Sequence, residues 1–120
     1  MTEKDTRYRD LLARQLAMNE QTFAALRRHG LSPDTEVRLD FAYRAPNRLA
    51  AEGLKQLLAE QTDYEAAVQS DGGILRKRWS VVGRTQQTVV SSSILDQGVT
   101  WMVTAGLERE CEFDGWGAEV

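Results

Sequence analysis

The chain has 120 residues, 42% of them hydrophobic, so it is long enough for one domain with a single core, which buries roughly two thirds of its unfolded surface. Its formal net charge of −3 argues against a protein that binds nucleic acid through its overall field, because phosphate binding depends on Lys and Arg. A single cysteine excludes an internal disulfide, and no apolar run approaches the ~20 residues of a membrane span or resembles a signal peptide, so we expect a cytoplasmic protein without membrane contact.

Residues 1–30 predict a long amphipathic helix, from about Thr6 to His29. The segment is rich in Ala, Leu, Arg and Gln, which favour helix, and Gly30 with Pro33 ends it. Its apolar residues recur every three or four positions and share one face: Tyr8, Leu12, Leu16, Phe23 and Leu26. We expect this face to dock on the chain's own sheet or on a second copy, which would form a homodimer.

Residues 31–120 predict the body of the domain, to which the N-terminal helix is added; it begins with a strand and a helix. Apolar residues alternate over 37–44 and place one set of side chains on the same strand face: Val37, Leu39, Phe41 and Tyr43. Asn47 is then a candidate N-cap for a helix over 49–61. The buried stripe of that helix is predicted from four residues: Ala50, Leu54, Leu57 and Leu58.

The second half of this domain predicts a hairpin, a helix and a closing strand. A short strand over 64–68 is followed by the turn sequence Ser70-Asp71-Gly72-Gly73 and by extended residues 75–88. Ser93 and Asp96 have the spacing of a capping box for a helix that ends near Arg109. Its buried stripe has five members: Leu95, Val99, Met102, Val103 and Leu107. A strand over 113–120 completes the domain.

The predicted order after the first helix is strand, helix, strand, strand, helix, strand. This is the split βαβ pattern of ferredoxin-like folds, in which helices cover an antiparallel sheet. We therefore expect an α+β, ferredoxin-like βαββαβ sandwich with an extra N-terminal helix.

Residues able to perform catalysis or bind metal are few. His29 is the only histidine and Cys111 the only cysteine, so no metal-ligand pair, catalytic triad or Cys-His dyad exists in the sequence. Gly72-Gly73 lacks the Lys-Ser/Thr of a phosphate loop. We expect a protein that is not an enzyme and uses no metal or cofactor. A small enzyme remains a third hypothesis, because fold alone does not decide function.

One basic cluster contains an aromatic residue: Arg76, Lys77, Arg78 and Trp79. RNA-binding sheets of this general kind stack bases on exposed aromatic rings beside cations, so this strand is a candidate RNA-binding surface. The sequence Arg78-Trp79-Ser80-Val81-Val82-Gly83 does not match the RNA recognition motif. The alternative is that Trp79 packs inward beneath the helices while Arg76 and Arg78 face solvent.

The last residues carry the most specific pattern. Gly115 and Gly117 flank Trp116, which lets the backbone bulge while the indole stays on one face. A helix, an acidic residue, an aromatic residue and then Asp114-Gly115-Trp116 resembles the closing pattern of the ribonuclease E inhibitor B (RraB) family. The resemblance covers roughly residues 36–120 and includes the aromatic strand around Trp79 and the strand 39–43 that leads into a helix after Pro46.

Members of that family are small non-enzymatic regulators with a ferredoxin-like α/β sandwich. They bind the endonuclease ribonuclease E away from its catalytic centre and change its activity. The resemblance therefore implies a cytoplasmic regulator of RNA degradation that acts by protein-protein interaction, with ribonuclease E or another ribonuclease as its partner. It also implies that Asp114, Gly115 and Trp116 are a family motif, for which we predict a structural role.

Overall fold

The computed structural model describes residues 3–32, 35–72 and 77–117, which form three helices and two antiparallel sheets. The larger sheet has the strand order β3-β4-β2-β6, with β3 at Glu65–Asp71, β4 at Arg78–Arg84, β2 at Asp40–Ala45 and β6 at Glu112–Gly117. The smaller sheet pairs β1 (Glu36–Val37) with β5 (Thr88–Val89). The helices are α1 (Glu3–Arg28), α2 (Arg48–Gln61) and α3 (Ser92–Glu108).

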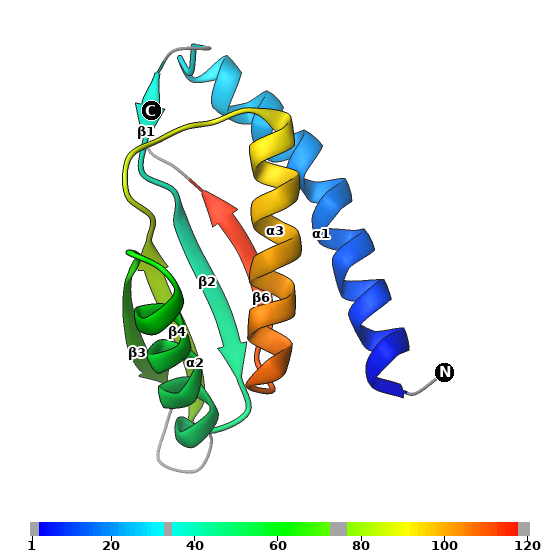
Figure 1. Ribbon diagram of the computed structural model, residues 1–120, viewed down its shortest axis with the longest axis vertical. Helices are drawn as coiled ribbons and strands as arrows, with labels where there is room; N and C mark the ends of the chain where they lie inside the picture. The colour runs from blue at the N-terminus through cyan, green and yellow to red at the C-terminus, as the bar shows by residue number, and fades with distance from the viewer. Residues whose placement is uncertain (1–2, 33–34, 73–76, 118–120) are drawn as a thin grey trace.

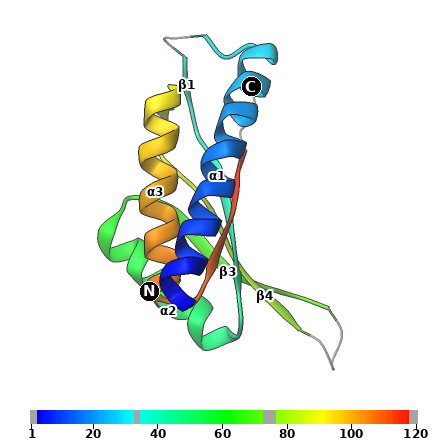
Figure 2. The ribbon, with the colours of Figure 1, turned by 90° about the vertical axis from the view of Figure 1, so that its right-hand side faces the viewer.

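Helices α2 and α3 cover one face of the larger sheet, and α1 lies beside α3 along the β6 edge (Figures 1 and 2). The predicted α+β sandwich is confirmed, and the elements of the larger sheet follow the expected βαββαβ order. The detailed ferredoxin-like assignment stays a prediction. No helix in the described parts of the chain is both long and apolar enough to cross a membrane.

The core lies between the larger sheet and the helices, and the predicted faces form it. The strand residues Val37, Leu39, Phe41 and Tyr43 are all buried, as are all five residues of the α3 stripe. In α2, Leu54 and Leu58 are fully buried, and Ala50 and Leu57 pack at the margin. The Tyr43 hydroxyl donates to the Met102 carbonyl at 2.7 Å, which satisfies the buried phenol.

Helix α1 docks on α3 and β6 of its own chain. All five residues of its predicted apolar face pack against the core, in two clusters: Tyr8, Leu12 and Leu16 in one, Phe23 and Leu26 in the other. The most deeply buried line of the helix, however, runs through Leu11, Gln15 and Asn19. Two polar residues thus occupy the centre of the contact.

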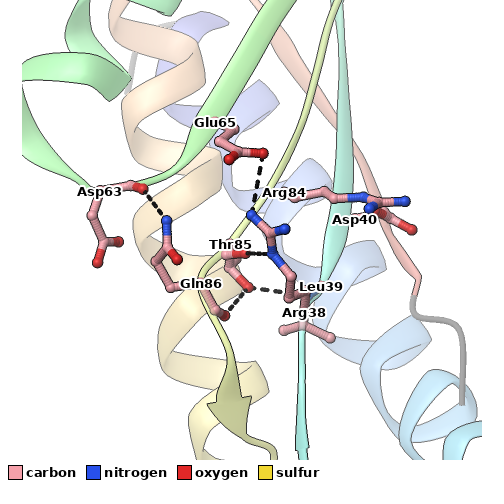
Figure 3. Close-up of polar contacts among 8 residues, drawn as sticks. All are labelled: Arg38, Leu39, Asp40, Asp63, Glu65, Arg84, Thr85 and Gln86. Carbon is pink, nitrogen blue, oxygen red and sulfur yellow. Dashed lines mark hydrogen bonds and ion pairs between the residues drawn. The ribbon is translucent and has the colours of Figure 1, made fainter.

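The strand predicted over 37–44 is interrupted at Arg38 and Leu39. Asp40 pairs with Arg84, and Val37 pairs with Thr88. The two pairs are three positions apart on the first segment and four positions apart on the segment that it pairs with, which therefore contains one extra residue. Thr85 lies at this junction: its N–H donates to the Leu39 carbonyl at 2.9 Å, and its Oγ1 accepts from the Leu39 N–H at 3.0 Å (Figure 3). The extra residue forms a bulge. The prediction of one strand over 37–44 is therefore wrong, because it divides into β1 and β2. The prediction of one extended segment over 75–88 is wrong for the same reason, because its described part divides into β4 and β5.

Side chains around this bulge hold the two sheets together. Arg38 Nε donates to the Thr85 carbonyl at 3.2 Å, and its Nη2 lies 3.1 Å from a Glu65 oxygen (Figure 3). Gln86 Nε2 donates to the Asp63 carbonyl at 2.9 Å. The polar residues of the predicted strand therefore take part in the junction.

Both central helices begin at side-chain caps. The predicted Asn47 cap is confirmed, since its side chain accepts from the Ala50 N–H at 2.8 Å. The predicted capping box of Ser93 and Asp96 is wrong, because Ser91 is the N-cap and accepts from the Ile94 N–H at 3.1 Å. Three successive serines offer equivalent acceptors, so the point where the chain turns into the helix decides which one caps it.

Candidate functional site

The Asp114-Gly115-Trp116 motif forms a bulge in β6, next to the central strand β2. Tyr43 pairs with Phe113 and Ala42 pairs with Gly115, so Asp114 is the extra residue. Gly115 has a φ of 123°, which residues with a Cβ rarely adopt. The motif therefore contains a glycine because the backbone requires one. The closing strand was predicted to continue through 118–120, which lie outside the described residues.

The Trp116 indole joins β6 to both neighbouring helices. Its ring packs edge-on against Phe113, with centroids 5.2 Å apart. On α3, a Cβ at Gly98 would stand 3.0 Å from the indole, so this glycine makes room for the ring. The indole Nε1 donates to Asn19 Oδ1 on α1 at 3.3 Å. Trp116 is half-buried and fixed from three sides.

Two buried polar residues of α1 complete this junction, and the sequence analysis missed both. Gln15 is 6% exposed and donates through Nε2 to the Phe113 carbonyl at 3.1 Å; Asn19 is 4% exposed and donates through Nδ2 to Asp96 Oδ1 at 3.1 Å. Two signals were available in the sequence: the four-residue spacing of Leu11, Gln15 and Asn19, and the position of Asn19 in the gap of the apolar stripe between Leu16 and Phe23.

A groove of about 300 Å³ lies between α1 and the β6 edge of the sheet. It is lined by Gln15, Met18, Asn19 and Thr22 of α1, by residues 40–42 of β2 and by residues 114–117 of β6. We call it the α1–β6 groove. It contains the whole Asp114-Gly115-Trp116 motif, and Gly115 and Gly117 contribute no side chain to fill it.

Among the described residues, the charged side chains that line the α1–β6 groove are Asp40 and Asp114. Each has an arginine partner that does not line the groove. Arg84 Nε donates to Asp40 at 2.7 Å (Figure 3), whereas Arg44 Nε lies 3.8 Å from Asp114. The lining itself therefore presents acceptors and negative charge.

Glu112 lies at the start of β6 and carries the most strongly paired carboxylate of this region. Arg7 on α1 donates to it, and Arg44 lies 3.5 Å away. The hydrogen bond from Arg7, together with the charges of Arg7, Arg44 and Arg14, lowers the pKa of Glu112 below its usual range. This contact ties the first turns of α1 to the sheet.

Of the predicted basic cluster, the structure describes Lys77, Arg78 and Trp79. Arg76 lies outside the described residues, Lys77 and Arg78 are exposed, and Trp79 is half-buried. Trp79 is on the same strand face as Val81, which is buried under the helices, so Arg78 faces the opposite side of the sheet. The Lys77 Nζ lies 6.0 Å from the Trp79 ring centroid.

The reactive residue types lie apart from the groove. Cys111 is buried, and burial together with the Glu110 charge raises the pKa of its thiol to about 11. His29 is exposed just after α1. Within residues 3–32, 35–72 and 77–117, no three His, Cys, Asp or Glu side chains gather where they could hold a metal ion.

The sequence matches no model of a known protein family, and it matches no curated protein sequence. The α1–β6 groove and the motif that builds it are therefore the features of the molecule that bear on its function.

Proposed function

We propose that this chain is a non-catalytic regulator that binds another protein, and that its partner is ribonuclease E or another ribonuclease whose role in RNA degradation it modulates in the cytoplasm. The ribonuclease is the partner that the family resemblance implies. The observation that carries the proposal is the position of the Asp114-Gly115-Trp116 motif in the α1–β6 groove. The motif is anchored on one side by the indole and open to a partner on the other.

The α1–β6 groove is held open by buried contacts. Gln15 donates to the Phe113 carbonyl, and Asn19 accepts from the Trp116 indole. Both side chains are almost fully buried, so these bonds fix α1 to β6. A site that is ordered before binding loses less conformational entropy when a partner arrives. At about 300 Å³ the groove is at the small end of ligand pockets, and it suits a side chain better than a large cofactor.

The sheet face next to the groove extends the surface. Figure 2 shows that α2 and α3 cover one face of the larger sheet and that α1 lies at its edge, so the opposite face carries no helix. On the uncovered face, one row of small side chains crosses the four strands: Ala67, Val82, Ala42 and Gly115. Small residues let a partner approach closely, and a specific interface needs about 800 Å² on each side. The groove and this row together supply a continuous docking surface.

The proposal is tested by capture and by RNA cleavage. The tagged chain is used to capture proteins from extracts of its host, and the rate of RNA cleavage by the captured ribonuclease is then measured with and without the purified chain. Met18 is 48% exposed on the rim of the groove, so Met18→Lys should weaken capture, whereas Gln21→Lys on the exposed side of α1 should not. Capture without any ribonuclease or degradosome component would contradict the proposal.

RNA binding by the segment Arg76–Trp79 is the second hypothesis, and the contact between Lys77 and Trp79 favours it by keeping a cation beside an aromatic ring. It predicts an affinity for single-stranded RNA that falls steeply with salt. If no binding appears at low salt, this hypothesis is excluded.

A further inference from the structure

We infer that the α1–β6 groove binds the guanidinium group of an arginine side chain, presented by an extended segment of a partner protein. The inference rests on the proposed function only in taking the occupant to belong to a protein. It is carried by the acceptors that face the groove and by the shape of its lining.

The first acceptor is the amide oxygen of Gln15. The side-chain nitrogen is already used, because it donates to the Phe113 carbonyl at 3.1 Å. A carbonyl only accepts, so this bond fixes which end of the amide faces β6. Oε1 lies 3.9 Å from the position of a Cβ on Gly115, and both Gln15 and Gly115 line the groove. An almost fully buried side chain thus presents its amide oxygen over the motif glycine.

Two carboxylates supply the remaining acceptors. The side chains of Asp40 and Asp114 are 44% and 54% exposed and line the same groove. Arg84 occupies one oxygen of Asp40, whereas the 3.8 Å between Arg44 and Asp114 is longer than a hydrogen bond. None of the lining residues that the structure describes is a cation, so a donor placed there meets acceptors and negative charge.

The apolar part of the lining suits the aliphatic stem of such a side chain. Met18 and the indole of Trp116 form its walls, and no described residue comes within 4 Å of a Cβ position at Gly117. Long cationic side chains bury their methylene groups against apolar surface and keep the charged head near acceptors. A guanidinium presents five donors in a plane and packs on aromatic faces, whereas an ammonium is a compact, strongly hydrated charge. This lining therefore favours arginine over lysine.

The test uses nuclear magnetic resonance of the full chain labelled with ¹⁵N. The probe is a capped five-residue peptide with one arginine among glycine and serine, and the matched control is the same peptide with citrulline, which has the same shape without the charge. Arginine should produce saturable shifts of the Gln15 side-chain amide, the Gly115 and Gly117 amides and the Trp116 indole. Its affinity should exceed that of the citrulline peptide about tenfold, as expected for a hydrogen bond to a charged group.

Matched variants separate the groove from general electrostatic attraction. Asp114→Asn should lower the affinity about fivefold or more, because it removes a charge that lines the groove. Glu52→Gln is the control, since Glu52 is 47% exposed and lies 3.7 Å from Arg48 on α2, away from the groove. It should leave the affinity unchanged. Equal effects of the two variants would overturn the inference.

Two further outcomes also decide the question. Equal binding of the arginine and citrulline peptides, or shifts confined to residues outside the groove, would overturn the inference. If the peptide binds in the groove but no ribonuclease is captured, the inference holds and the proposed function fails. If a ribonuclease is captured and regulated while the peptide produces no shift, the proposed function holds and the inference fails.

Discussion

Replacing Trp116 with alanine tests how the motif is anchored, and we expect the free energy of unfolding to fall by about 3 kcal/mol. Removal of a fully buried tryptophan costs about 3–5 kcal/mol, and Trp116 is only half-buried, which places its packing contribution below that range. The variant also removes the indole donor of Asn19 Oδ1. Because the Asn19 side chain is only 4% exposed, this loss adds about 1–3 kcal/mol to the cost. A small domain has only about 5–15 kcal/mol in total.

Urea unfolding followed by circular dichroism measures this loss. For a chain of this size, about 3 kcal/mol corresponds to a decrease of roughly 12 °C in melting temperature. Trp101→Ala is the matched control, because Trp101 is 38% exposed on α3, and it should cost less than about 1 kcal/mol. Trp116→Phe keeps a ring against Phe113 and removes the bond to Asn19, so its loss should be intermediate.

The same variants distinguish anchoring from recognition. If Trp116→Ala unfolds at the same urea concentration as Trp101→Ala, the indole does not anchor β6 and our reasoning is refuted. Unchanged stability with lost partner binding would instead identify the motif as an exposed recognition tip. Both measurements must therefore be made on one preparation of each variant.

Three further predictions concern other parts of the fold. Gly83→Ala should cost about 3 kcal/mol or more in urea unfolding, because a Cβ there would stand 2.0 Å from the Glu65 carbonyl oxygen and force β3 and β4 apart; a wild-type midpoint would contradict this pairing. Cys111 should react with iodoacetamide at about pH 8 only after unfolding, since burial raises its pKa to about 11; rapid labelling of the native chain would refute its burial. Because Arg7 lowers the folded-state pKa of Glu112, this contact stabilises the fold above the ordinary glutamate pKa of about 4.3, and the stabilisation is lost as the pH falls through the lower value. Glu112→Gln should therefore be less stable than wild type at about pH 7 in urea unfolding, and this difference should shrink as the pH falls below about 4.3; a difference that does not shrink in acid would contradict this assignment.

The sequence predicted which faces are buried better than where elements begin and end. Val37, Leu39, Phe41 and Tyr43 are buried as expected even though the strand is interrupted between them, because alternation continues through the bulge. The bulge itself depends on Thr85, whose hydroxyl and amide both bond to Leu39. A threonine at the end of an extended segment carries no sequence signal for that role, since the contact spans 46 residues along the chain.

The groove was missed for a different reason. Prediction of a docking face from apolar periodicity assigns polar residues to solvent, so Gln15 and Asn19 were left out of the stripe of α1. Both are buried because each has a partner from a distant element, Phe113 and Trp116 respectively. Burial of a polar side chain is favourable only with such partners, and these partners become visible only once the helix is placed on the sheet.

Within the motif itself, the three residues have separable physical roles. Gly115 is required by its positive φ, and Trp116 by its contacts with both helices. Neither the backbone conformation nor the packing on the helices requires Asp114. Its side chain is 54% exposed, and Arg44 lies 3.8 Å away, beyond hydrogen-bonding distance. An exposed ion pair of this kind contributes at most about 1 kcal/mol to stability. We therefore assign the proposed binding role of the motif to Asp114, because changing that residue alone alters the charge of the groove and leaves its anchor in place.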